Sequence, residues 1–244
     1  KNYLIINFIF KSPEYILILY LIFFVTFFKN NNFFKKKFVF FNYKISFLFS
    51  VLIFPNLVLF LVPYPIYDGM RLFVWTVPYY CIIPGLALYY LYKNNKSIFS
   101  KGINVFLSVV IIYFLYNFFQ ITPYQYTYLN ILNGKKNERY KKFENDYWGT
   151  SLKELISESK LSKTKEYQVA TCGVSINITK EISKKNGYKN FNFVNEKNAD
   201  LIIMTNRVTV KNNVMINCFD KYDGNNVSEV KRGNLTLSSI RNIR

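Results

Sequence analysis

The chain has 244 residues, a formal net charge of +18 and 20% aromatic residues, and it contains no histidine. The missing histidine, together with the absence of any CxxC pair, argues against the usual zinc sites and against Ser-His or Cys-His catalysis. Apolar residues crowd into the first half of the chain, in runs too long for soluble strands. The second half is polar and rich in Asn and Lys. This asymmetry predicts a membrane part followed by a soluble part.

Apolar runs in the first half are long enough, or nearly so, to cross a hydrocarbon core of roughly 30 Å as helices. The predicted spans are residues 12–28, 45–62, 72–92 and 103–121. A soluble protein would need helices that are apolar on every face to hold these runs, which is rare. The sequence therefore predicts an α-helical polytopic bundle of about four transmembrane helices over residues 1–121.

Charges in the short connections predict the orientation of these spans. Residues 29–44 carry five lysines and residues 93–102 carry three, whereas in residues 63–71 Asp68 and Arg71 cancel. Short cytoplasmic loops carry the Lys/Arg excess, so both basic connections are expected in the cytoplasm and "PYPIYDGMR" outside. The soluble part that follows the fourth span is then expected outside as well.

The sequence starts at Lys1 with a hydrophobic stretch, without the basic n-region or small-residue cleavage site of a signal peptide. We expect the chain to be a later part of a larger membrane protein. Upstream transmembrane helices of the same protein are accordingly expected as its partners.

The second half alternates helical and strand-like patterns. Residues 151–159 and 179–188 have helical spacing, with Gly187 ending the second stretch. Buried strands are expected at "YQVATCGVSI" and "ADLIIMTN", and later strands at "NVMINCF" and "GNLTLSSI", separated by the turn "YDGNN". The pattern predicts a small α/β domain over residues 151–244, preceded by a connector over 122–150.

The cysteines are Cys81, Cys172 and Cys218. Cys81 lies in an apolar run and is interpreted as a packed thiol. Cys172 and Cys218 both fall in predicted strands. A disulfide can join them if this part is outside the cytoplasm, but two separate buried thiols is the interpretation we favour.

Stretches in three places together resemble a known family. "YDGMRLFVWTVP" (67–78), "PYQYTYLNILNG" (123–134) and "FENDYWGTSLKEL" (143–155) resemble, in order and spacing, elements of bacterial GT-C membrane glycosyltransferases. These enzymes are related to the dolichyl-phosphate-mannose protein mannosyltransferases, glycosyltransferase family 39. The resemblance covers most of residues 10–244, loosely outside these motifs.

The resemblance implies a polytopic enzyme that moves a sugar from a polyprenyl-phosphate carrier to an acceptor on the extracytoplasmic side of the bacterial inner membrane. The expected base is an acidic residue of the first outer loop, which would lie upstream of Lys1, so no catalytic residue is expected in this chain. Leu72 stands where the family usually has His, so that histidine's role does not carry over. No cofactor or divalent metal is implied, and no nucleic-acid partner is expected.

Arg71 is the candidate for contact with the lipid phosphate, because arginine binds phosphate with two parallel hydrogen bonds. It is expected at the outer membrane surface, at the depth of a polyprenyl phosphate. Asp68 could orient Arg71 or a sugar hydroxyl. The alternatives are an interfacial anchor or an ion pair for Arg71, and a turn role for Asp68.

The segment after the fourth span is interpreted as a joint between the membrane and outer parts that can border the acceptor path. The residues assigned to it are Tyr124, Tyr126, Glu144, Asp146, Tyr147 and Trp148. The tyrosines are equally typical of any membrane interface. Asp146 could instead support a helix that begins near Thr150 or Ser151.

Two other functions remain open at this stage. A non-enzymatic membrane protein would use its outer α/β domain to bind a partner or an envelope polymer, with membrane lipids around its spans. A channel or transporter is disfavoured, because the spans lack charged residues and show no internal repeat.

Overall fold

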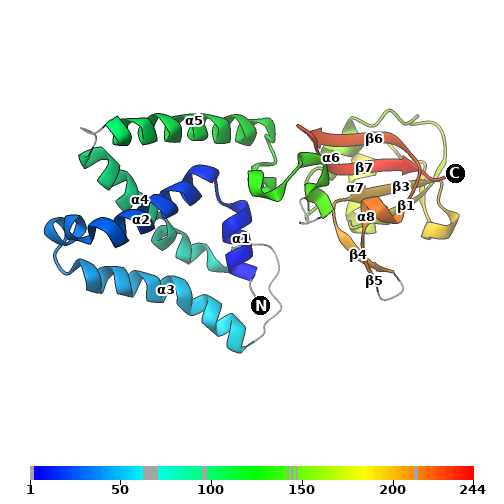
Figure 1. Ribbon diagram of the computed structural model, residues 1–244. Helices are drawn as coiled ribbons and strands as arrows, with labels where there is room; N and C mark the ends of the chain where they lie inside the picture. Colours follow the sequence, from blue (N-terminus) through cyan, green and yellow to red (C-terminus); the bar gives the residue numbers. More distant parts are fainter. Residues whose placement is uncertain are drawn as a thin grey trace. The chain divides into compact units, whose positions relative to one another are not determined.

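The fold is described from a computed structural model, which divides into two compact units (Figure 1). It describes residues 3–62, 71–94, 98–141, 143, 146, 148–211 and 214–244. Unit 1 comprises Lys1–Phe118 and Leu129–Leu132, and unit 2 comprises Phe119–Tyr128 and Asn133–Arg244. The chain therefore enters unit 2, returns to unit 1 for a few residues, and then completes unit 2.

Unit 1 consists of helices and short connections, with no strand among its described residues. Its elements are α1 (Tyr3–Lys11), α2 (Glu14–Lys37), α3 (Phe41–Leu61), the 3-10 helix η1 (Arg71–Thr76), α4 (Val77–Lys93) and α5 (Ile98–Gln120). Four helices are long and apolar enough to cross a membrane, over Glu14–Lys37, Phe41–Leu61, Phe73–Lys93 and Ser100–Gln120. These helices coincide with the four predicted apolar runs, which confirms that part of the sequence prediction.

Helix α2 differs from the prediction at its C-terminal end. The apolar run was expected to end at residue 28, but helical structure extends to Lys37, interrupted by a kink at Asn30, where the backbone is non-helical. Hydropathy falls where the polar residues begin, but "KNNNFFKKK" contains neither Pro nor Gly, so a helical segment can form again after the kink. Lys35, Lys36 and Lys37 fall in its last turn, where cations interact favourably with the helix dipole.

Aromatic side chains hold unit 1 together where α2 turns into α3. Phe34 is fully buried and stacks on Phe41, with ring centroids 5.1 Å apart. Phe23 lies 5.8 Å from Phe34, and Tyr90 of α4 lies 6.1 Å from it. Such ring pairs add to the stabilisation from burial alone. Cys81, predicted to be a packed thiol, is instead exposed on α4.

Unit 2 is built on a five-stranded mixed sheet in the order β2-β1-β3-β7-β6. Its strands are β1 (Tyr167–Cys172), β2 (Phe191–Phe193), β3 (Leu201–Thr205), β6 (Asn225–Arg232) and β7 (Leu235–Asn242). β1 runs parallel to both β2 and β3, while β7 is antiparallel to β3 and β6. A separate hairpin consists of β4 (Val208–Lys211) and β5 (Val214–Asn217).

Both faces of the sheet are covered. All five residues of β3 are buried, and successive side chains of a strand point to opposite faces, so each face of β3 must pack against other elements. Leu201 and Ile203 join the cluster formed with α6 (Leu152–Ser157) and α7 (Ile176–Lys185). Ile202 and Met204 join the opposite cluster with α8 (Cys218–Lys221). The result is a three-layer arrangement with the sheet in the middle, and the small α/β domain expected from the sequence is confirmed as a mixed α/β sheet domain.

The later strands are predicted less accurately. β1, β3, β5 and β7 lie where strands were expected, but β2, β4 and β6 were not predicted. β6 has one buried residue, Val230, in the pattern of an edge strand, so it lacks the apolar signal of a core strand. Cys218, placed in a strand from the sequence, is the first residue of α8, whose start is capped by the Asn217 side chain.

The interpretation of two separate thiols is wrong, because Cys172 and Cys218 form a disulfide. It joins the end of β1 to the start of α8 across 46 residues, with Cα atoms 5.8 Å apart. The sequence placed both residues in strands and gave no register between them. The folded sheet brings the two residues together, since β1 lies beside β3 and α8 covers the same face of the sheet as Cys172.

Removing the disulfide should destabilise unit 2 while leaving unit 1 unchanged. Closing a loop of this length restricts the unfolded chain, and the double change Cys172→Ser/Cys218→Ser is expected to cost about 2–4 kcal/mol. Hydrogen exchange of unit 2 peptides in the detergent-solubilised full chain measures this loss. Cys81→Ser is the matched control, and equal protection in both variants would contradict the expectation.

Candidate functional site

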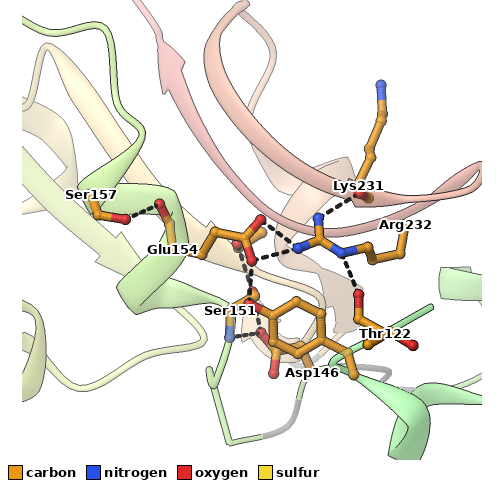
Figure 2. A network of polar contacts seen from close by, with 9 residues as sticks. Thr122, Asp146, Ser151, Glu154, Ser157, Lys231 and Arg232 are labelled. Carbon is orange, nitrogen blue, oxygen red and sulfur yellow. Dashed lines mark hydrogen bonds and ion pairs between the residues drawn. The ribbon is translucent and has the colours of Figure 1, made fainter. Parts of the chain in front are cut away.

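Asp146 of the "FENDYWGTS" segment is the centre of a buried hydrogen-bond network in unit 2 (Figure 2). Its side chain is fully buried, at 0% exposure. The carboxylate accepts bonds from the backbone N–H groups of Thr150 at 2.9 Å and Ser151 at 3.2 Å. It also accepts from the hydroxyl groups of Thr150, Ser151 and Tyr126, the last at 2.6 Å. Buried charge of this kind is tolerated because both oxygens are satisfied by several donors.

This network explains how α6 begins. Ser151 precedes the helix and its own side chain does not cap it. Asp146 instead satisfies the N–H groups of Thr150 and Ser151 from outside, where a negative charge is also favoured by the helix dipole. The Ser151 hydroxyl lies 2.7 Å from that of Ser238 on β7, which ties the start of α6 to the sheet.

A second network joins the segment after α5 to α6 and β6. Glu154 of α6 accepts a bond from the Tyr124 hydroxyl at 2.7 Å, and its two oxygens lie 2.7 and 2.6 Å from Nη2 of Arg232. Arg232 also donates from Nε to the Thr122 carbonyl at 2.8 Å (Figure 2). Its guanidinium lies over the Tyr124 ring, 5.2 Å from the centroid, as in cation–π contacts.

Both tyrosines are held in their protonated form. Burial raises the pKa of Tyr124, and the hydrogen bond to Glu154 raises it further. Burial likewise raises the pKa of Tyr126, followed by its bond to the Asp146 carboxylate. Each phenol therefore remains a donor to its carboxylate at neutral pH.

The same segment lies across the carboxyl ends of β1 and β3. Gly149 adopts the left-handed conformation, with φ of 64°, and a Cβ there would meet Val174 at 2.9 Å and Thr205 at 3.7 Å. Only glycine allows this approach without displacing Val174. The Asn206 amide donates to the Phe143 carbonyl at 3.2 Å. In open α/β sheets this point, where neighbouring parallel strands connect in opposite directions, is where ligands commonly bind.

The structure brings some of the predicted site residues together. Tyr126 bonds to Asp146, and Tyr124 is buried in the unit 2 core beside Glu154. Trp148 is 59% exposed. Asp68, Glu144 and Tyr147 lie outside the described residues, and Arg71 opens η1.

Sequence reasoning missed Glu154, Arg232 and Ser238 as members of these networks. Glu154 stands inside the quoted motif, three residues after the predicted helix start, where a capping-box residue is common. That position was a usable signal, although here Glu154 binds Arg232 and Tyr124. Arg232 and Ser238 are 78 and 87 residues from their partners, so no local pattern could have indicated them.

The chemistry available to Asp146 is limited by this environment. A general base must reach the proton that it removes, directly or through one water. Asp146 is buried and engaged by five donors, so its geometry is that of a structural anchor. Across the described ranges, no group of three or more Cys, Asp or Glu side chains could hold a metal ion.

Searches of family models, curated proteins and solved structures find no match to this chain. The fold itself defines the class: a membrane protein with four helices able to span the bilayer, followed by a small mixed α/β domain.

Replacing Asp146 should lower the stability of unit 2. Asp146→Ala leaves buried N–H and O–H donors without an acceptor, which is expected to cost about 3 kcal/mol. Asp146→Asn should be less destabilising, since one oxygen remains to accept. Urea unfolding of the full chain, followed by hydrogen exchange in unit 2, measures both.

The exposed Asp223 provides the matched control for this experiment. Asp223→Ala should change stability by no more than about 0.5 kcal/mol. If Asp146→Ala behaved like this control, the anchoring role would be refuted.

Proposed function

We propose that this chain is the C-terminal part of a membrane glycosyltransferase that uses a polyprenyl-phosphate-linked sugar. The observation that carries the proposal is that two of the motifs that resemble the family are hydrogen-bonded to each other. Tyr124 and Tyr126 of "PYQYTYLNILNG" bond directly to Glu154 and Asp146 of "FENDYWGTSLKEL". Segments that resemble one family separately are thus parts of one structure, as expected if they are inherited together.

The proposed reaction is an inverting transfer. An acceptor hydroxyl oxygen attacks the anomeric carbon while a base takes the hydroxyl proton. The bond from that carbon to the phosphate oxygen breaks, and polyprenyl phosphate leaves with the electron pair. The proposal assigns the base to an acidic outer loop upstream of Lys1, in keeping with the anchoring geometry of Asp146.

Arg71 is assigned to the leaving phosphate. It stands two residues before the candidate span that begins at Phe73, at the level where a lipid phosphate would lie. As the phosphate leaves it gains negative charge, and a fixed guanidinium stabilises that charge more than it stabilises the bound donor. Asp68 is proposed to orient this guanidinium or a sugar hydroxyl.

Unit 2 is proposed to lie on the extracytoplasmic side of a bacterial inner membrane. Lysine-rich connections between the spans support this orientation. The disulfide between Cys172 and Cys218 supports it independently, because disulfides persist mainly in oxidising compartments. The two arguments rest on different residues and agree.

Cysteine labelling tests this orientation in a Cys81→Ala background. Ser162 is exposed in unit 2, and Lys36 is exposed in the last turn of α2. Ser162→Cys should react with a membrane-impermeant maleimide in intact cells whose outer barrier is opened. Lys36→Cys should react only after the inner membrane is permeabilised, and the reverse pattern would refute the proposed orientation.

Transfer is tested with the complete protein in proteoliposomes, using labelled polyprenyl-phosphate sugars and a range of acceptors. Loss of a charged hydrogen bond to phosphate in Arg71→Ala should lower kcat/KM about tenfold or more. Arg244→Ala, which removes an exposed arginine paired with Asp200, should leave transfer unchanged.

The outcomes separate the two functions. Transfer that is insensitive to Arg71→Ala removes the phosphate assignment alone. If no polyprenyl-phosphate sugar is used, the enzyme proposal fails. A membrane protein whose outer domain binds a partner or an envelope polymer is then the better account.

A further inference from the structure

Exposed apolar side chains gather at one edge of the unit 2 sheet. β1 and β3 are parallel and paired up to Cys172 and Met204, so their carboxyl ends lie side by side. The exposed apolar residues beside these ends are Trp148, Ile176 and Val208, at 59%, 46% and 39% exposure, and Met215, at 79%, lies on the hairpin that follows β3. We refer to these four residues as the carboxyl-edge rim.

Independent contacts place members of the rim at this edge. Gly149, next to Trp148, approaches Val174 after β1 and Thr205 at the end of β3. Ile176 is the first residue of α7, three residues beyond the start of the loop at Gly173.

The β4–β5 hairpin follows directly from β3 and extends away from the sheet (Figure 1). In its register Val208 pairs with Asn217, which is two residues from Met215 on the same strand. Side chains of paired residues, and of residues two apart, share a face. Val208 and Met215 therefore lie on one face of the hairpin.

The covalent path keeps this edge close to the end of a candidate span. The fourth span ends at Gln120, and Tyr126, six residues later, is bonded to Asp146. Six residues reach at most about 20 Å even when extended. Trp148 is two residues from Asp146, so the rim is tethered near the bilayer surface wherever the fourth helix spans the membrane. A short tether gives a high effective concentration, so that weak surface contacts suffice for docking.

The chemistry of the rim and of its surroundings suits a lipid surface. Tryptophan favours the membrane interface, where its ring meets the acyl chains and its N–H meets water. Residues 133–244 carry 21 Lys and Arg against 12 Asp and Glu. This excess attracts unit 2 to anionic headgroups, by about 1 kcal/mol per cation close to the surface.

We propose that the carboxyl-edge rim docks unit 2 on the headgroup layer of the membrane that holds unit 1, with Trp148 inserted at the interface. The contact holds the "FENDYWGTS" segment at the depth of lipid headgroups. It does not depend on glycosyl transfer or on which side of the membrane unit 2 occupies.

Fluorescence of Trp148 tests the proposal in the full chain. The sequence has two tryptophans, so Trp75→Phe leaves Trp148 as the only one. In vesicles of phosphatidylglycerol and phosphatidylethanolamine, lipids brominated near the headgroup end of the acyl chain should quench Trp148 at least twofold. Aqueous acrylamide should quench it less than half as strongly as it quenches free tryptophan.

A matched control places the single tryptophan elsewhere on unit 2. Lys165 is exposed and precedes β1, at the opposite end of that strand from the rim. In Trp75→Phe/Trp148→Phe/Lys165→Trp, acrylamide should quench fully and brominated lipid should not quench. Hydrogen exchange of unit 2 peptides in the same variant shows whether unit 2 remains folded when Trp148 is removed.

Each contrary result overturns the proposal in a different way. Full acrylamide quenching of Trp148 with no effect of brominated lipid would mean that the rim is in water. Protection from acrylamide without lipid quenching would mean that protein covers the rim. Replacing Met215 and Val208 with Ser should lower lipid quenching of Trp148, and an unchanged signal would remove the hairpin from the docking surface.

Discussion

The fold of unit 2 depends on one buried carboxylate. Removing the charge of Asp146 from water is costly, and that cost is offset because two backbone N–H groups and three hydroxyl groups converge on it. These donors come from segments before and after it in the chain, so satisfying the charge fixes the segment after α5, the start of α6 and, through Ser151, strand β7. A structural requirement of one side chain thereby organises several elements.

This arrangement changes how an acid-rich, aromatic motif is interpreted. "FENDYWGTS" has the composition of an active site, with acids for proton transfer and rings for stacking on a sugar. In the structure, the residues of the motif have separate roles instead. Asp146 points inward and serves structure, Gly149 permits close approach to the strand ends, and Trp148 is exposed. Asp146 is thus buried and Trp148 exposed, although the two are only two residues apart.

The sequence predicted what depends on local pattern, and missed what depends on distant partners. Four apolar runs sufficed for the spans, and the apolar run within "ADLIIMTN" made β3 evident. β6, with its mostly polar residues, is a strand only because β7 pairs with it along an edge. Hydrogen bonds that span 20 residues for Tyr126 and 87 for Ser151 leave no periodic trace. The disulfide was missed for the same reason, since pairing depends on which strands become neighbours.

The position of β7 in the sheet has a consequence for how unit 2 assembles during synthesis. β7 lies between β3 and β6 and follows every other strand in the sequence. Until it emerges, β3 presents a mostly apolar strand with an unpaired edge, the kind of surface on which chains pair with one another. Pairing of β7 with β3 closes this edge and brings Ser238 to Ser151. The start of α6, although encoded 87 residues earlier, is therefore completed only when the final hairpin arrives. The edge of β3 stays open to pairing with other chains for as long as that hairpin is delayed.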